Sequence, residues 1–164
     1  MKKVYVILMA VIFSLTACEK DEKNGNTGSN GNCTSGHICF TVNGNTVSLP
    51  MKIVAQTQGN FKFEHIDTAN GHTSVDIYID DLTSNNYDFG NAFGAPGHAE
   101  FYYRHGTSRS NLDFYYISAS LGGSLTLTEN NGKYSGTFSL QVKDQLDNSQ
   151  ANITNGSFKD LILQ

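Results

Sequence analysis

The chain is poor in several features that would assign it to a large class of proteins. Of its 164 residues, 11 are Lys or Arg and 15 are Asp or Glu, and the formal net charge is −4. This deficit of basic residues argues against nucleic acid as a partner, because phosphate contacts need clustered Lys and Arg. Only two prolines are present, Pro50 and Pro96, and both fall at the ends of expected strands or in loops. No apolar run reaches the roughly 20 residues that a membrane-spanning helix needs.

Motifs for catalysis and for metal binding are also missing. The sequence has no Gly-x-Ser-x-Gly elbow of a serine hydrolase and no His-x-His pair along a strand. His65 and His72 could meet across a turn near Asp67, and Asp80 with Asp81 could bind calcium weakly, although the spacing of a calcium loop is absent. Solvated turns account for these side chains more simply. We therefore predict no catalytic residue, no metal site and no cofactor.

The longest apolar run, Val4 to Leu15, follows two lysines and has the length of a secretory signal core. It is followed by Thr16-Ala17-Cys18, and Leu15-Thr16-Ala17-Cys18 resembles the lipobox of bacterial lipoproteins. The resemblance implies that residues 1–17 are a lipoprotein signal peptide and that Cys18 carries diacylglycerol and an acylated amine. Several acyl chains give stable anchoring, so outer-membrane lipid is an expected partner through Cys18. The alternative is a soluble secreted protein in which Cys18 is incidental.

Residues 18–32 are expected to form a lipidated, flexible tether. No apolar side chain occurs in residues 19–32, and residues 24–32 are Asn, Gly, Thr and Ser only, which is the composition of a flexible linker. Residues 19–23 resemble the charged export signal of surface lipoproteins of the Bacteroidetes, which implies a place at the cell surface. A periplasm-facing position on the outer membrane is the alternative. Residues 33–164 have the length of a single domain.

Two cysteines remain after Cys18 is assigned to lipid. Cys33 and Cys39 enclose a short loop, and an oxidising compartment favours a disulfide between them. Loop entropy for so short a segment corresponds to about 2–2.5 kcal/mol of stabilisation. The alternative is a zinc site made by Cys33, His37 and Cys39, for which no fourth ligand is evident.

Short runs rich in Val, Ile, Phe, Tyr and Thr alternate with Asn, Gly and Asp clusters from Cys39 onwards. This pattern predicts about ten short strands in an all-β, antiparallel sandwich or barrel, with no helix. Asn-Gly pairs predict hairpin turns at residues 43–44, 131–132 and 155–156. The last of these turns would separate a strand at residues 151–154 from a closing strand at residues 157–163.

Several expected strands of this chain carry motifs that resemble those of a known protein family. The segments 86–90 (NYDFG), 136–140 (GTFSL) and 153–158 (ITNGSF) look like those of a family of uncharacterised Bacteroidetes lipoproteins with a GTFSF … ITNGxF pattern. The resemblance covers about residues 38–163 and implies a β fold and an envelope location, but no catalytic residues. The chain departs from the pattern at Asn86, where the family often has Gly, and in its Cys33–Cys39 pair.

Two aromatic triplets supply the best indication of function. Phe101-Tyr102-Tyr103 and Phe114-Tyr115-Tyr116 lie in neighbouring expected strands, separated by a polar loop at residues 105–111. One face of each strand should enter the core, which leaves Tyr102, Arg104 and Tyr115 on the other. Tyrosine combines an apolar ring with a polar tip, which suits a glycan or an envelope protein as partner. The alternative is aromatic pairing that only stabilises the sheet.

The sequence therefore predicts a lipid-anchored, non-catalytic binding or interaction module, with Tyr102, Arg104 and Tyr115 as its ligand-binding residues. The alternative is a hydrolase of glycans or peptides that uses two carboxylates on a sheet face. Its candidate carboxylates are those in expected strands, namely Glu64, Asp76, Glu100 and Asp113.

Overall fold

The computed structural model describes residues 33–56, 59–69, 71–90, 92, 94–118 and 121–164. The expected signal peptide (1–17), Cys18 and the tether (18–32) lie outside the described residues. Where the chain is described, no helix is long and apolar enough to cross a membrane. The fold is built from antiparallel strands, which confirms the all-β prediction, with eleven strands where about ten were expected.

The strands, in chain order, are β1 (His37–Val42), β2 (Asn45–Pro50), β3 (Lys52–Ala55), β4 (Phe61–Asp67), β5 (His72–Ile79), β6 (Asn86–Asp88), β7 (Ala99–Ser108), β8 (Asn111–Ile117), β9 (Gly123–Asn130), β10 (Lys133–Asp144) and β11 (Gln150–Ile162).

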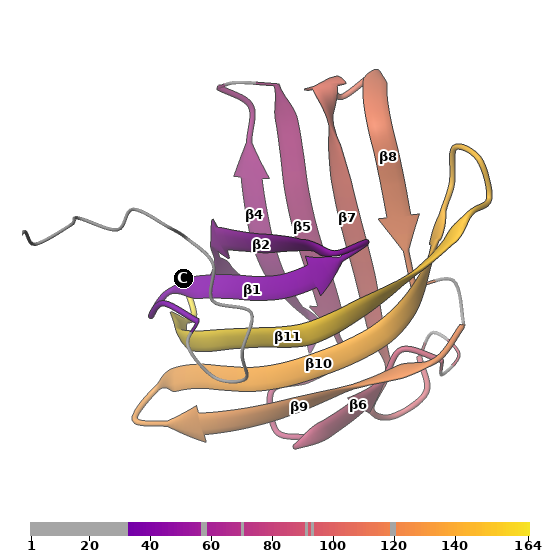
Figure 1. The fold of residues 1–164 in the computed structure, drawn as a ribbon. Coiled ribbons are helices and arrows are strands. Elements are labelled where there is room, and N and C mark those ends of the chain that lie inside the picture. Colours follow the sequence, from indigo (N-terminus) through magenta and orange to yellow (C-terminus); the bar gives the residue numbers. More distant parts are fainter. Residues whose placement is uncertain (1–32, 57–58, 70, 91, 93, 119–120) are drawn as a thin grey trace, which may run out of the picture.

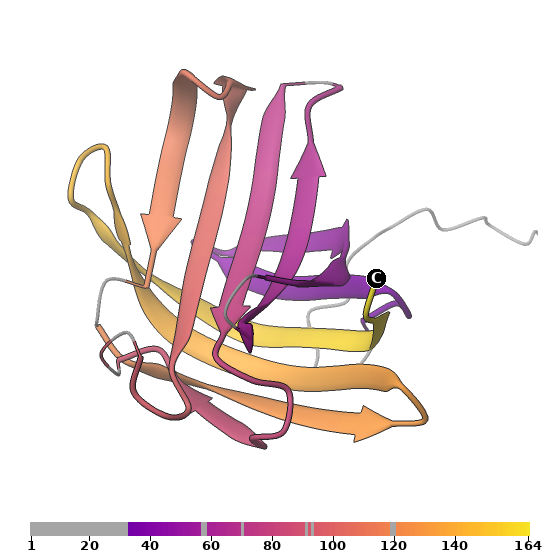
Figure 2. The ribbon, with the colours of Figure 1, turned by 180° about the vertical axis from the view of Figure 1, so that it is seen from behind.

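One sheet curves around a single core. Its strand order is β2-β1-β11-β10-β8-β7-β5-β4-β3, and β9 and β6 continue outward from β10. Strand β10 belongs to both halves of the sheet, because residues 133–140 pair with β9 while Lys143 and Asp144 pair with β8. A bridge between Ile53 and Leu163 brings β3 back to the end of β11. The sheet is therefore a nearly closed barrel, in which β4, β5, β7 and β8 cross β1, β11, β10 and β9 (Figures 1 and 2).

The core is formed by the inward side chains of both halves. Phe40 of β1 packs edge-on against Phe101 and Tyr103 of β7, with ring centres 5.7 and 5.1 Å apart, and lies 6.2 Å from Phe138 of β10. Alternation along β5 buries Val75, Ile77 and Ile79 in this core. Every second residue of β4, β5, β7 and β8 consequently points away from the core, and these side chains form the face described below.

Two of the three predicted Asn-Gly hairpins are confirmed, and the third prediction is wrong. Residues 43–44 and 131–132 have positive φ and join β1 to β2 and β9 to β10. At residues 155–156, however, β11 continues as one strand with a bulge, because its pairing register shifts on both sides. Asn155 takes the left-handed conformation (φ 53°), and a Cβ at Gly156 would lie 2.4 Å from the Phe138 carbonyl oxygen. The pair here serves close strand packing.

The expected loop at residues 105–111 is much shorter in the structure. Strand β7 runs to Ser108 and β8 begins at Asn111, with register shifts on both sides of Gly106. The bulges at this glycine let the two strands pair almost to their tip. Both strands therefore reach further from the core than the sequence pattern indicated.

The predicted disulfide is present. Cys33 and Cys39 are joined, with an S–S distance of 2.12 Å and Cα atoms 5.7 Å apart. Both thiols that the zinc alternative requires are consumed by this bond. The bridge ties the start of the domain to β1.

Candidate functional site

The structure brings together all three residues that the sequence nominated. Tyr102 and Arg104 of β7 point outward, as does Tyr115 of β8, and the neighbouring Phe101 and Tyr103 are buried in the core. The ring centres of Tyr102 and Tyr115 lie 6.4 Å apart. The guanidinium carbon of Arg104 lies 4.8 Å from the Tyr115 ring centre and 5.8 Å from that of Tyr102, so the cation is held against both rings.

A third tyrosine extends this group. Tyr78 of β5 packs edge-on against Tyr102, with ring centres 5.7 Å apart, so that Tyr78, Tyr102 and Tyr115 form a tyrosine row across β5, β7 and β8. The sequence analysis did not single out Tyr78. Its signal was present, because it alternates with the core residues Ile77 and Ile79 and therefore had to face outward.

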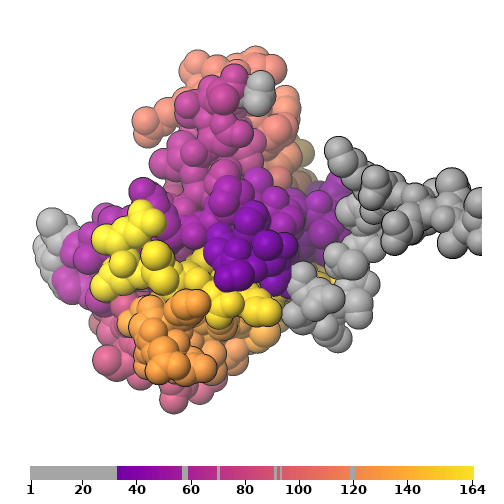
Figure 3. All heavy atoms as spheres, turned by 90° about the vertical axis from the view of Figure 1, so that its left-hand side faces the viewer, coloured from indigo at the N-terminus to yellow at the C-terminus, as the bar shows by residue number. Residues whose placement is uncertain are grey.

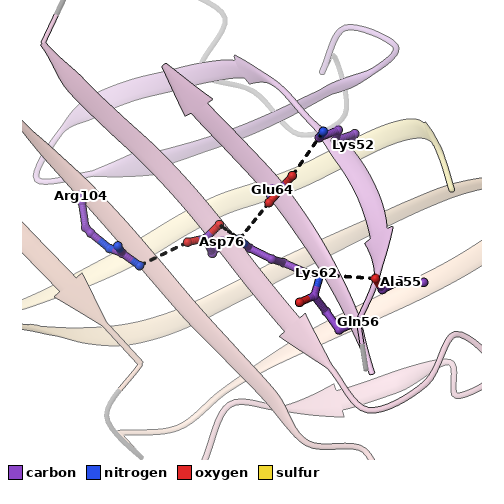
Figure 4. A network of polar contacts seen from close by, with 7 residues as sticks. All are labelled: Lys52, Ala55, Gln56, Lys62, Glu64, Asp76 and Arg104. Carbon is purple, nitrogen blue, oxygen red and sulfur yellow. Dashed lines mark hydrogen bonds and ion pairs between the residues drawn. The ribbon is translucent and has the colours of Figure 1, made fainter. Parts of the chain in front are cut away.

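Figure 4 shows a chain of ion pairs on the same face. It adjoins the tyrosine row through Lys62, whose Nζ lies 5.5 Å from the Tyr78 ring centre, and through Arg104. Lys62 Nζ lies 2.8 Å from Glu64 Oε2 and 3.1 Å from Asp76 Oδ1, and Arg104 Nη2 lies 3.3 Å from Asp76 Oδ2. Lys52 Nζ completes the chain at 3.3 Å from Glu64 Oε1. Cross-strand register produces this order, since Lys52 is opposite Glu64 and Glu64 is opposite Asp76. Cations and carboxylates alternate across β3, β4, β5 and β7.

The centre of this ionic network is withdrawn from water. The side chain of Asp76 is 6% exposed and that of Lys62 is 14% exposed. Burial alone would lower the pKa of Lys62, but its bonds to Glu64 and Asp76 outweigh burial and raise that pKa above its usual range. The hydrogen bond from Lys62 lowers the pKa of Glu64, against the opposing effect of burial. Both groups are therefore charged at neutral pH.

Glu100 orders the other end of the face. The Tyr102 hydroxyl donates a 2.7 Å hydrogen bond to Glu100 Oε2, and His98 Nε2 lies 3.3 Å from Glu100 Oε1. Burial, followed by this bond to Glu100, raises the pKa of Tyr102. The phenol therefore stays protonated, and the ring is fixed by contacts on both of its sides.

A hollow of about 530 Å³ opens beside the network, toward the projecting tips of β4, β5, β7 and β8. Figure 3 shows these tips rising above the rest of the domain. The floor of the hollow is made by the outward side chains of β5 and by Arg104, and turns at the tips supply its rim. The residues used below are His72, Ser74, Asp76 and Arg104 on the floor, with Lys62, Ile66 and Arg109 around it.

The floor of the hollow contains buried polar atoms. His72 is 7% exposed and Ser74 is 3% exposed. His72 Nε2, Ser74 Oγ and Arg104 Nε have no hydrogen-bond partner among the described residues. Buried donors without partners are rare in proteins, because each costs about 1–3 kcal/mol. Three such atoms in residues that line one hollow make this hollow a candidate site for a polar group.

The four candidate carboxylates do not form one site. Glu64 and Asp76 lie opposite each other on β4 and β5, with Lys62 bound to both. Glu100 is engaged by Tyr102, and Asp113 is largely exposed, 3.9 Å from His105. The lowered pKa of Glu64 is opposite to the raised pKa that a general acid requires. The arrangement is suited to holding charge in place.

The structure also places the side chains that the histidine and calcium alternatives would use. His65 faces the inward side of β4 while His72 faces the outward hollow, so these two rings lie on opposite faces of the sheet. The two carboxylate oxygens of Asp81 accept four hydrogen bonds, from the backbone and hydroxyl groups of Thr83 and Ser84. In the part of the chain that is described, no three His, Cys, Asp or Glu side chains form a group that could hold a metal ion.

A second hollow, of about 470 Å³, lies on the outward face of β9, β10 and β11. Its polar lining is neutral and consists mainly of hydroxyls, from Ser124, Thr126, Thr137, Ser139 and Ser157. Thr126 and Thr137 already bond to each other at 2.9 Å. It has neither charged residues nor a tyrosine row.

Comparison of the chain with protein-family models, with curated proteins and with solved structures found no match. Two of the segments that carry the resemblance to Bacteroidetes lipoproteins, 136–140 and 153–158, pair with each other in the structure, with Gly136 opposite Phe158 and Leu140 opposite Ile153. The resemblance itself stays an expectation. The role of the outward face is therefore inferred from its geometry.

Proposed function

We propose that this protein is a non-catalytic glycan-binding module, anchored in the outer membrane by lipid on Cys18. One observation carries the proposal: the tyrosine row, the ionic network and the hollow adjoin one another on the outward face of β4, β5, β7 and β8. Aromatic surface beside convergent polar groups is the usual composition of a small-ligand site.

A glycan matches this combination of surfaces. A sugar ring presents C–H groups on its faces, which pack on aromatic rings, and hydroxyls at its edge, which both donate and accept hydrogen bonds. Tyr78, Tyr102 and Tyr115 supply half-buried rings with polar tips. Lys62 and Arg104 can donate to hydroxyls, and Asp76 can accept from them.

The face is ordered before any ligand arrives. Asp76 holds both Lys62 and Arg104, and Arg104 in turn packs on two tyrosine rings. Long cationic side chains normally lose about 0.5–1.5 kcal/mol each on being immobilised in an interface. Part of that cost is already met in the folded domain, which supports binding by a shallow surface.

The anchor completes the proposal. Lipidation of Cys18 followed by a polar tether would hold the domain close to the membrane with its orientation unrestricted. Cys18→Ala should then move the protein from the membrane fraction to the soluble fraction. A Cys18→Ala protein that still sediments with membranes would contradict the anchor without affecting the binding proposal.

The binding test uses a glycan array with the full-length protein in detergent. Tyr115→Ala should lower the affinity for the glycans that the array retains by about fivefold or more, as expected for a central aromatic contact. Tyr115→Phe keeps the ring and should bind nearly as the wild type does, and Thr137→Ala, on the other half of the sheet, should have no effect. Equal binding by Tyr115→Ala and the wild type would refute the proposed site.

A hydrolase remains the second candidate because Glu64 and Asp76 lie directly opposite each other on neighbouring strands. The bridge by Lys62 and the lowered pKa of Glu64 weigh against it. Release of reducing ends from a bound glycan, lost in Asp76→Asn, would favour the hydrolase. Binding without such release favours the module.

A further inference from the structure

The hollow beside the tyrosine row carries more positive than negative charge. Three cations line it, Lys62, Arg104 and Arg109, against the single carboxylate of Asp76. Asp76 is shared between Lys62 and Arg104, and Glu64, outside the hollow, is shared between Lys62 and Lys52. The two carboxylates of the network therefore face three cations, and Arg109 at the rim adds another positive charge. The whole chain has a net charge of −4, and this excess of cations is therefore a local feature. Such a hollow attracts anions.

Three unpartnered polar atoms belong to residues that line this hollow. Ser74 on β5 lies directly opposite Arg104 on β7, and His72 is the next outward residue along β5. Ser74 Oγ and Arg104 Nε are hydrogen-bond donors, and His72 Nε2 is a donor in the tautomer that carries its hydrogen there. All three atoms are buried and have no hydrogen-bond partner within the described chain. A carboxylate is a pure acceptor and can receive several such bonds at once.

The hollow is continuous with the tyrosine row through Arg104. One side of its guanidinium packs on Tyr115 and Tyr102, while the residue also lines the hollow and its Nη2 is fixed by Asp76. Ile66, 57% exposed at the rim, offers an apolar contact. A ligand seated on the rings would extend directly into the hollow.

We infer that the hollow is a subsite for the carboxylate of an acidic sugar, and that the glycans bound by this face contain uronic or sialic acid units. The inference rests on the proposed function, and it adds the substrate class. Ser74, Arg104 and His72 bind the carboxylate, Arg109 attracts it from the rim, and the tyrosine row binds the neighbouring sugars.

The experiment compares each acidic glycan with a counterpart that lacks its carboxylate charge. Isothermal titration of the full-length protein in detergent is carried out with tetragalacturonate and with its methyl ester, and with sialyllactose and with lactose. For at least one of these pairs, the acid should bind about tenfold or more tightly than its neutral counterpart, because hydrogen bonds to a charged group are the strong ones. Added salt should reduce the difference in affinity between the acid and its neutral counterpart, because salt screens charge.

Variants locate the charge preference. Arg104→Gln should reduce the preference for the acid by about tenfold, and Ser74→Ala, a smaller change, by about threefold. Lys52→Gln is the matched control, since it removes the same charge from the same network but lies outside the hollow. If Lys52→Gln and Arg104→Gln reduce the preference for the acid equally, that preference comes from long-range electrostatics. This result would overturn the subsite.

A second measurement does not depend on the folding of a variant. The chain has two arginines, Arg104 and Arg109, so its Nε–H signals in a proton–nitrogen spectrum are few. Addition of the acid should shift the Arg104 Nε–H signal, and addition of the methyl ester should shift it much less. No shift with a bound acid would overturn the subsite.

The outcomes separate the two proposals. Equal binding of acids and neutral counterparts, abolished by Tyr115→Ala, would overturn the acidic subsite and leave the glycan-binding face standing. Absence of binding to any saccharide tested would overturn both. Binding of polyglutamate as tight as that of tetragalacturonate would also overturn the assignment to acidic sugars, in favour of acidic peptides.

Discussion

The outward faces of the two halves of the sheet differ in charge, although the inward faces of both halves are apolar. On β3, β4, β5 and β7 the outward residues include Lys52, Lys62, Glu64, Asp76 and Arg104, joined into one ionic network. On β9, β10 and β11 the polar residues that line the second hollow are Ser, Thr and Asn, and the hydroxyls of Thr126, Thr128 and Thr137 bond locally within the sheet. The two faces satisfy the same requirement for polar contact with water in different ways.

The difference is informative because a solvated sheet face needs no buried charge. Around the second hollow the polar side chains are neutral, and no ionised side chain lines it. Withdrawing Asp76 and Lys62 from water costs free energy that their attraction only partly offsets. The half that carries this cost also carries the unpartnered atoms of His72 and Ser74. Function, rather than stability, is the simpler reason for such an arrangement.

The largest expected loss of stability is that of a core substitution, with which substitutions on the outward faces can be compared. Phe138 lies in the shared core within 6.2 Å of Phe40 and 6.0 Å of Phe101, measured between ring centres. Phe138→Ala should lower the free energy of unfolding by about 3–5 kcal/mol in urea denaturation. Tyr102→Ala, on the outward face, should cost about 1 kcal/mol. If the two variants lose the same stability, the tyrosine row is ordinary core and the proposed binding face loses its support.

A smaller effect separates the two outward faces directly. Asp76→Ala leaves Lys62 and Arg104 without their shared partner, and should cost about 2–3 kcal/mol, below the value for a fully buried pair because both cations can turn toward water. Thr137→Ala, outward on β10, removes only a local hydroxyl contact and should stay within about 0.5 kcal/mol of the wild type. Urea denaturation of both variants measures the contrast. If both variants lose the same stability, the ionic network contributes no more than the hydroxyl contacts, and the two outward faces do not differ in this respect.

The smallest expected effect is a dependence on pH. The pKa of Glu64 in the folded protein is below its ordinary value of 4.5, so the unfolded chain takes up a proton first on acidification. Glu64 therefore stabilises the fold above about pH 4.5, and this contribution is lost as the pH falls through the lower, folded-state pKa. The melting temperature of Glu64→Gln should fall less steeply than that of the wild type over this range. Parallel curves would show that Lys62 does not hold the Glu64 carboxylate.

The sequence predicted the strands and the tyrosine pair because both follow from alternation. Tyr102 and Tyr115 flank residues that must be buried, so their outward direction needed no knowledge of strand order. The Cys33–Cys39 bond was also predictable, because it is local. Asn155-Gly156 misled the prediction because the same pair serves a hairpin turn and a bulge, and only contact with Phe138 of β10 selects the bulge.

The ionic network could not be predicted in the same way. Lys52, Lys62, Asp76 and Arg104 lie on four strands, and their contacts depend on strand order and register. From the sequence alone Asp76 was one of several carboxylates on solvated strands. The hollow likewise needs the tips of β4–β5 and β7–β8 to lie side by side, which no local pattern encodes.

The most direct test of the central claim is to map the bound glycan onto the two faces by the chemical shifts of backbone amides. Isotope-labelled full-length protein in detergent is titrated with tetragalacturonate or with the glycan that the array retains best. The account predicts that the shifted amides belong to β4, β5, β7 and β8, with the largest changes around Ser74, Arg104 and Tyr115. Shifts concentrated on β9, β10 and β11, around Thr126 and Thr137, would contradict it.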